Sequence, residues 1–154
     1  MEHVDKFKAA VAAVVAALTA LWGWYGWLVV IWGICMLLDY ATGTGAALKE
    51  GNWSSSVARE GIWHKVGAIA AVLVACLLDA AIGQAAANLP NFPISYSVFL
   101  GPLVVVWYIL TECGSIVENA GALGAPIPKW LATRVAQLRD KVDTDADENT
   151  KGGG

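Results

Sequence analysis

The sequence has few charged residues for its length. Asp, Glu, Lys and Arg make up 15% of its 154 residues, whereas soluble domains carry roughly 25%. Hydrophobic residues make up 57% of the chain, and the mean hydropathy is +0.56. A soluble domain of this size has too little interior to bury so much apolar sequence. The composition therefore excludes an ordinary soluble domain and indicates a membrane protein.

Patterns typical of catalytic, metal and nucleic-acid sites are also missing. The three cysteines, Cys35, Cys76 and Cys113, lie in apolar stretches without metal-ligand spacing, and they form no even set for a disulfide framework. Neither histidine, His3 or His64, belongs to a known catalytic motif. The basic residues are too scattered for a nucleic-acid interface. We predict a chain that is not an enzyme, holds no metal or cofactor and binds no nucleic acid.

What the sequence does contain is three long apolar runs with almost no charge. The runs are residues 9–38, 66–89 and 94–117. The first ends at Asp39, the second contains only Asp79, and the third contains only Glu112. About 20 apolar residues of helix cross the hydrocarbon core of a bilayer. The runs therefore predict an all-α, polytopic membrane protein.

The positions of the ten Lys and Arg residues predict how often the chain crosses. None lies between the last two runs, and positive residues favour the cytoplasmic side. All ten share that side if the chain crosses four times, through helices at about 5–21, 27–47, 66–89 and 94–117. The first of these helices contains too few apolar residues to cross comfortably. The alternative is therefore a chain that crosses three times, with an N-terminal helix lying in the membrane interface.

The predicted transmembrane domain occupies residues 1–125 and is followed by two further segments. In residues 126–142, apolar side chains recur at helical spacing, with basic residues between them: Leu131, Val135, Leu138 and Val142. This pattern predicts an amphipathic helix on the inner leaflet, with a soluble C-terminal helix as the alternative. Residues 143–154 are acidic and predict a disordered tail. We expect a multi-pass membrane protein with a cytoplasmic C-terminus.

Asp79 makes its own helix marginal in lipid. Strong apolar residues of this run favour insertion by roughly 3–5 kcal/mol, and a central Asp opposes it by about 2.5–3.5 kcal/mol. Asp79 should therefore face protein or water. It lies on a stripe of small residues that allows close helix packing, although composition alone could produce part of it: Gly67, Ala71, Ala75, Gly83 and Ala87. No Lys or Arg lies inside the runs, so we expect polar groups, protons, water or a second copy as partners of the acids.

A set of short motifs resembles the bacteriophage lysis and toxin-secretion holin family. In order along the chain, the matching positions are Asp39, Tyr40, Thr42, Gly43, Ser54, Ser55, Gly61, Lys65, Asp79, Glu112, Glu118, Asn119, Gly121, Pro126 and Pro128. The similarity covers roughly residues 24–131. No single motif is specific for this family, and the resemblance rests on the order and spacing of the whole set.

The resemblance implies a small phage protein that oligomerises in the host membrane and opens lesions. Endolysin, or a toxin, would pass through as cargo, and an antiholin is a possible partner. We expect Asp79, Glu112 and Asp39 to be pore or gating residues and the lipid bilayer and further copies to be the main partners. A small ion channel or transporter subunit, or an antiholin, is the alternative.

Overall fold

The computed structural model describes residues 2–91 and 99–151, and within them the chain is helical without any strand. The elements are α1 (Glu2–Trp22), the 3₁₀ turn η1 (Gly23–Tyr25), α2 (Gly26–Lys49), α3 (Ser55–Asn88), α4 (Leu100–Leu123) and α5 (Lys129–Lys151). This confirms the all-α prediction.

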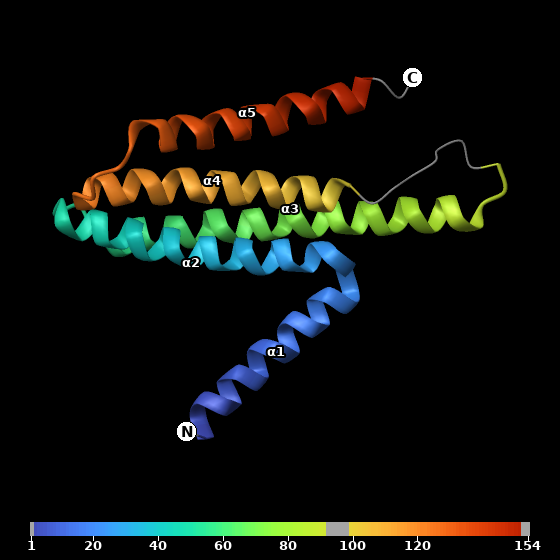
Figure 1. Cartoon of the computed structure of the whole chain (residues 1–154), viewed down its shortest axis with the longest axis horizontal. Coiled ribbons are helices and arrows are strands. Elements are labelled where there is room, and N and C mark those ends of the chain that lie inside the picture. Colours follow the sequence, from blue (N-terminus) through green and yellow to red (C-terminus); the bar gives the residue numbers. More distant parts are fainter. Residues whose placement is uncertain (1, 92–98, 152–154) are drawn as a thin grey trace.

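Helix α4 lies at the centre of the molecule. Figure 1 shows α2, α3 and α4 side by side and α5 on the far side of α4, with successive helices running in opposite directions. Accordingly α4 contacts α2, α3 and α5. The core between α2, α3 and α4 is formed by Tyr25, Trp32, Ala68, Val72, Cys76 and Val105. Val105 of α4 is fully buried there.

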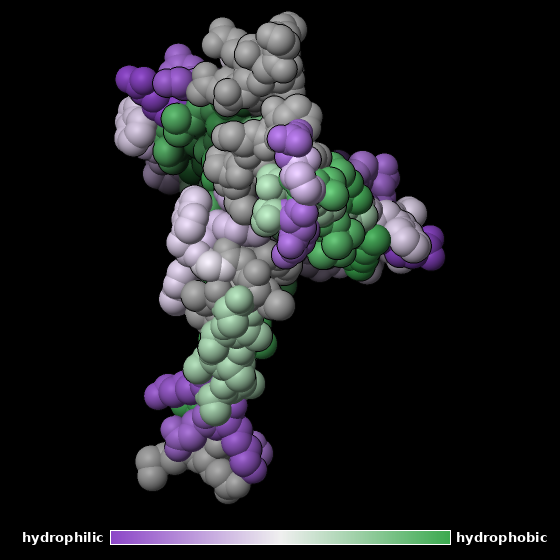
Figure 2. Space-filling model, turned by 90° about the vertical axis from the view of Figure 1, so that its right-hand side faces the viewer, coloured by the Kyte–Doolittle hydropathy of each residue, from purple (hydrophilic) through white to green (hydrophobic). Residues whose placement is uncertain are grey.

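Three segments are long and apolar enough to cross a membrane: Gly23–Lys49, Ser55–Asn88 and Leu100–Leu123. Helix α1 is not among them, because Asp5, Lys6 and Lys8 near its start leave only residues 9–22 without charge. It projects away from the bundle (Figure 1), as a pale, weakly apolar arm that ends in hydrophilic residues (Figure 2). A fourth crossing through α1 remains a prediction.

Local signals explain why two of the helices begin or end away from the predicted bounds. α3 starts eleven residues before the predicted residue 66 because Ser54 caps it, accepting a hydrogen bond from the Val57 amide at 3.3 Å. α4 continues past residue 117 to Leu123 and is followed by the C-cap residue Gly124, whose φ of +97° suits glycine. The predicted start at residue 94 lies outside the described residues.

The C-terminal segment differs from the predicted disorder after residue 142. Helix α5 continues to Lys151. Between Pro128 and Gly152 the sequence contains no glycine or proline, so nothing in the backbone interrupts a helix once it has started. At about 1.5 Å per residue, its 23 residues make a helix of roughly 34 Å, close to the thickness of a bilayer core.

Candidate functional site

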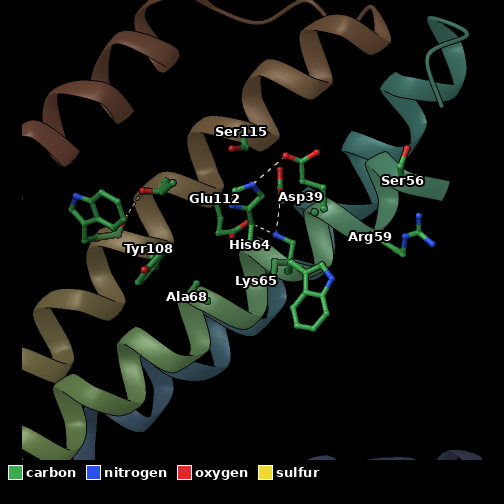
Figure 3. A pocket seen from close by; sticks show the side chains of 15 residues that line it. Asp39, Ser56, Arg59, His64, Lys65, Ala68, Tyr108, Glu112 and Ser115 are labelled. Carbon is green, nitrogen blue, oxygen red and sulfur yellow. Dashed lines mark hydrogen bonds and ion pairs between the residues drawn. The ribbon is translucent and has the colours of Figure 1, made fainter. Parts of the chain in front are cut away.

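The first candidate site is an ion cluster that joins three helices. The Lys65 ammonium of α3 lies 2.9 Å from an Asp39 carboxylate oxygen of α2 and 2.7 Å from a Glu112 carboxylate oxygen of α4. All three side chains are at most one-fifth exposed. Figure 3 shows Lys65 pointing between the two acids. Two carboxylates and one ammonium leave the cluster with a formal charge of −1.

Amide and hydroxyl groups extend this cluster on the α2 side. Asn119 of α4 donates to the second Asp39 carboxylate oxygen at 3.1 Å and lies 3.4 Å from the Thr42 hydroxyl. Thr42 in turn donates to the Leu38 carbonyl at 2.8 Å. A Cβ at Gly43 would lie 3.3 Å from the Asn119 amide nitrogen. The glycine therefore allows α4 to bring its amide close to α2.

An open groove of about 950 Å³ runs beside the cluster between α3 and α4 (Figure 3). Asp39, Lys65 and Glu112 line one part of it, and Tyr108 and Ser115 line another. The groove leaves one side of the ion cluster uncovered by the rest of the chain. The acids of this site are consequently half-sequestered rather than sealed.

The second candidate site surrounds Asp79, which is only 2% exposed. Its carboxylate accepts hydrogen bonds from the backbone amides of Phe99, Leu100 and Gly101, at 3.4, 3.1 and 2.7 Å. These amides begin α4 and have no carbonyl partner in the preceding turn of a helix. The carboxylate also meets the positive end of the α4 dipole. Asp79 therefore caps α4 from the neighbouring helix α3.

Gly101 makes this cap possible because it lets the two helices approach. A Cβ at this position would lie 3.0 Å from the Cys76 sulfur and 3.1 Å from the Asp79 carboxylate. Asp79 and Lys65 are fourteen residues apart on α3, or about 21 Å along the helix. The two candidate sites thus stand at opposite ends of the contact between α3 and α4.

The predicted small-residue stripe is packed only in its middle. Ala75 is buried and Ala71 is half-buried, whereas Gly67 and Ala87 are exposed. A Cβ at Gly67 or Gly83 would meet nothing within 4 Å. Within the single chain, the ends of the stripe therefore do not serve close packing.

The remaining predicted positions are mostly structural neighbours of the ion cluster or of helix ends. Gly61 and Tyr40 line a smaller cavity beside Asp39. Ser55 is the first residue of α3. Glu118 lines a cavity between α4 and α5. Gly121 lies against Ile127, in the connection to α5 that also contains Pro126 and Pro128.

The structure corrects the prediction that no basic residue is available to the intramembrane acids. Lys65 stands one residue before the second charge-poor run, and because α3 begins at Ser55 it lies inside the helix and reaches Glu112. For Asp79 the partners are polar groups, one of the predicted kinds, supplied by the α4 backbone.

Sequence reasoning also missed the partnership between Lys49 and the end of α4. The Lys49 ammonium donates to the Ala122 carbonyl at 2.9 Å, satisfying one of the last carbonyls of that helix. The position of Lys49 just after the predicted helix 27–47 was the available signal. Its partner, 73 residues away in the sequence, could not be read from local pattern.

A comparison with known protein families identifies the family of this chain. The family model described as the bacteriophage holin family matches residues 16–140. The chain belongs to the bacteriophage holin family. The match includes both candidate sites, the three apolar helices and the first half of α5. The resemblance inferred from the motifs is therefore confirmed.

Individual relatives of this holin-family chain carry no described activity. An uncharacterized protein of Halalkalibacterium halodurans is 34% identical over 104 residues, covering 68% of this chain and 72% of the relative. An uncharacterized Clostridium perfringens protein is 32% identical over 108 residues, covering 70% and 72%. A 14.9 kDa protein of the same organism, encoded in the nagH 3′ region, is 31% identical, covering 70% and 74%. No solved structure matches the chain.

The polar contacts of the two sites hold neighbouring helices together. Among the described residues, no group of three or more His, Cys, Asp or Glu side chains could hold a metal ion. The ion cluster and the Asp79 cap each join side chains or backbone groups of different helices. The holin-family chain is accordingly a membrane protein whose buried polar groups connect its apolar helices.

Proposed function

We propose that this chain oligomerises in the host cytoplasmic membrane and opens lesions through which endolysin, or a toxin, leaves the cell. The observation that carries the proposal is the holin-family match across three helices that are long and apolar enough to cross a membrane. Exposed apolar side chains on α2 and α3 supply surface for lipid and for further copies. The C-terminus is cytoplasmic before the lesion opens, and an antiholin is a possible regulator.

Asp39, Glu112 and Lys65 are the gating candidates in this proposal. They line an open groove, and they join α2, α3 and α4. A rearrangement of these helices during assembly must break or hydrate the ion pairs. The cluster is therefore placed to set how readily the single chain converts into the assembled form.

Asp79 has a different role in this proposal. Because its carboxylate is sealed between α3 and α4 and satisfied by backbone amides, it positions α4 and does not need another copy. Self-association is therefore driven by the exposed apolar surfaces of α2 and α3, not by an unsatisfied acid at Asp79.

Induction of the full chain in a bacterium tests the function. Membrane potential, viability and release of a folded, endolysin-sized cytoplasmic reporter are followed together, with an unrelated three-span membrane protein expressed to the same level as control. We expect a delay and then abrupt death with reporter release. Depolarisation without reporter release would indicate an ion channel or transporter. Absence of damage, combined with delayed lysis by another holin, would indicate an antiholin.

A further inference from the structure

The two sides of the helical bundle differ in chemistry. On α2 and α3, large apolar side chains point outward over the length of the spans. We call this surface the apolar belt; it includes Ile31, Ile34, Leu37, Leu73, Val74 and Leu77. Such a continuous apolar surface suits lipid tails or another apolar helix. The belt marks the side of the molecule that remains in hydrocarbon.

On the opposite side, α5 covers α4. Near the middle of α4, a Cβ at Gly114 would lie 3.8 Å from a Val135 methyl group. Further along, Val142 lines a small cavity together with Leu103 and Trp107. Every residue of α4 from 100 to 117 is buried or half-buried. Helix α5 thus follows α4 through most of the depth of the span (Figure 1).

The outward surface of α5 carries mainly charged side chains, together with two exposed large apolar ones, Trp130 and Leu138. The exposed ionisable residues of its described part are Lys129, Arg134, Arg139, Asp140, Lys141 and Asp143. Ionised side chains inside a membrane face protein or a water-filled cavity, because hydrocarbon cannot solvate them. α5 can therefore hold this position beside a membrane-spanning α4 only where its outer face meets water.

We infer that α5 coats the water-filled lumen of the lesion, with its apolar face on α4 and its charged face toward the water. The inference rests on the lesion-forming function proposed above. Without α5, the lumen would be walled by apolar side chains such as Leu103 and Val104 of α4, at the cost of exposing them to water. With α5 in place, the apolar belt faces lipid or neighbouring copies and the charged face forms the inner wall.

This arrangement implies two positions for α5. Before the lesion opens, no water is available beside α4, so the charged helix remains at the cytoplasmic surface. The connection at residues 124–128 is the hinge about which α5 moves relative to α4. Gly124 follows α4 in a left-handed conformation, and two prolines follow it, so the helix cannot continue through this segment. When copies assemble and water enters, α5 folds back along α4.

A disulfide between α4 and α5 tests the inference in vesicles. The full chain with its native cysteines replaced by Ala carries Gly114→Cys and Val135→Cys, at two positions whose side chains come into contact across α4 and α5. It is reconstituted into phosphatidylethanolamine–phosphatidylglycerol vesicles loaded with a protein-sized fluorescent dextran. We expect the disulfide to form during leakage and the oxidised protein to release dextran within about twofold of the reduced protein. In the matched pair Gly114→Cys and Gln137→Cys, which places the second cysteine on an exposed position of α5, we expect little disulfide.

The outcomes separate this inference from the function on which it rests. Leakage by the reduced protein that stops on oxidation, or leakage without a disulfide, would overturn the lumen position of α5 and leave lesion formation standing. Absence of dextran release by the unmodified chain would overturn the function, and the inference with it.

Charge variants in the native background give an independent test. Changing Arg134, Arg139 and Lys141 together to Leu makes the proposed inner wall apolar, whereas changing the same three to Gln keeps it polar. We expect the Leu variant to lose at least tenfold in dextran release rate and the Gln variant to stay within threefold of the native chain at equal membrane content. Equal behaviour of the two variants would contradict the inference.

Discussion

The ammonium of Lys65 and the carboxylate of Glu112 lie 2.7 Å apart, although 47 residues separate them in the sequence. This ion pair connects the N-terminal third of α3 to the middle of α4. Asp39 adds a second carboxylate to the same ammonium. Removal of Lys65 would leave two acids facing each other where α2, α3 and α4 meet.

Lys65→Met should destabilise the helix bundle by about 3 kcal/mol, because loss of one partner leaves a buried charge uncompensated. Adding Glu112→Gln should recover at least about 1 kcal/mol, since the like-charge contact disappears. The free energy of unfolding in mixed detergent micelles measures both. His64→Gln is the control: its side chain is 79% exposed, and we expect a change within about 0.5 kcal/mol. Strictly additive effects of the two changes would show that the residues do not interact.

Asp79→Leu should release the start of α4. The amides of Leu100 and Gly101 lose their acceptor, and leaving a buried donor unsatisfied costs about 1–3 kcal/mol. Hydrogen exchange of these two amides in detergent should accelerate about tenfold or more, and the time of lysis at equal expression should change.

The matched control for the Asp79 experiment is Gln84→Leu on the same helix. Gln84 is exposed, so neither exchange at the start of α4 nor lysis time should change. Unaltered protection of the α4 amides in Asp79→Leu would show that the carboxylate does not cap this helix.

Gly101→Ala should destabilise the contact between α3 and α4 by about 1–3 kcal/mol through overpacking. The new methyl group would meet the Cys76 sulfur at 3.0 Å and Asp79 at 3.1 Å, and adding Cys76→Ala should restore part of the loss. Thermal unfolding in detergent provides the measurement. Gly67→Ala, which meets nothing within 4 Å, should be neutral or stabilising by up to about 1 kcal/mol. Equal effects at the two glycines would refute the close approach at Gly101.

Reporter fusions at the two ends of the chain test the number of crossings. A green fluorescent protein fused after Gly154 should fluoresce in intact cells before lysis, since it folds only in the cytoplasm. A fusion before Met1 should fluoresce as well if α1 crosses the membrane. A dark N-terminal fusion with a bright C-terminal one would establish three crossings and place α1 outside. A dark C-terminal fusion would contradict the proposed orientation.

The sequence by itself determined the class of this protein. Apolar runs near the length that a bilayer requires, each with one acid at most, leave helices as the only spanning structure because lipid cannot satisfy backbone polar groups. The order of short motifs from Asp39 to Pro128 was sufficient to indicate the family, which the comparison with known families confirmed. These properties depend on residues that are close together in the chain, so they can be recognised from the sequence alone.

Only the tertiary structure decided which groups satisfy the buried acids. The partners of Asp79 are backbone amides, which every sequence contains at almost every residue, so no pattern could single out Leu100 and Gly101. The predicted helix began at residue 66, one residue after Lys65, whereas the capped start of α3 at Ser55 places Lys65 inside the helix and next to Glu112. The register of helices far apart in the chain depends on how their side chains interlock, and that depends on all of them together.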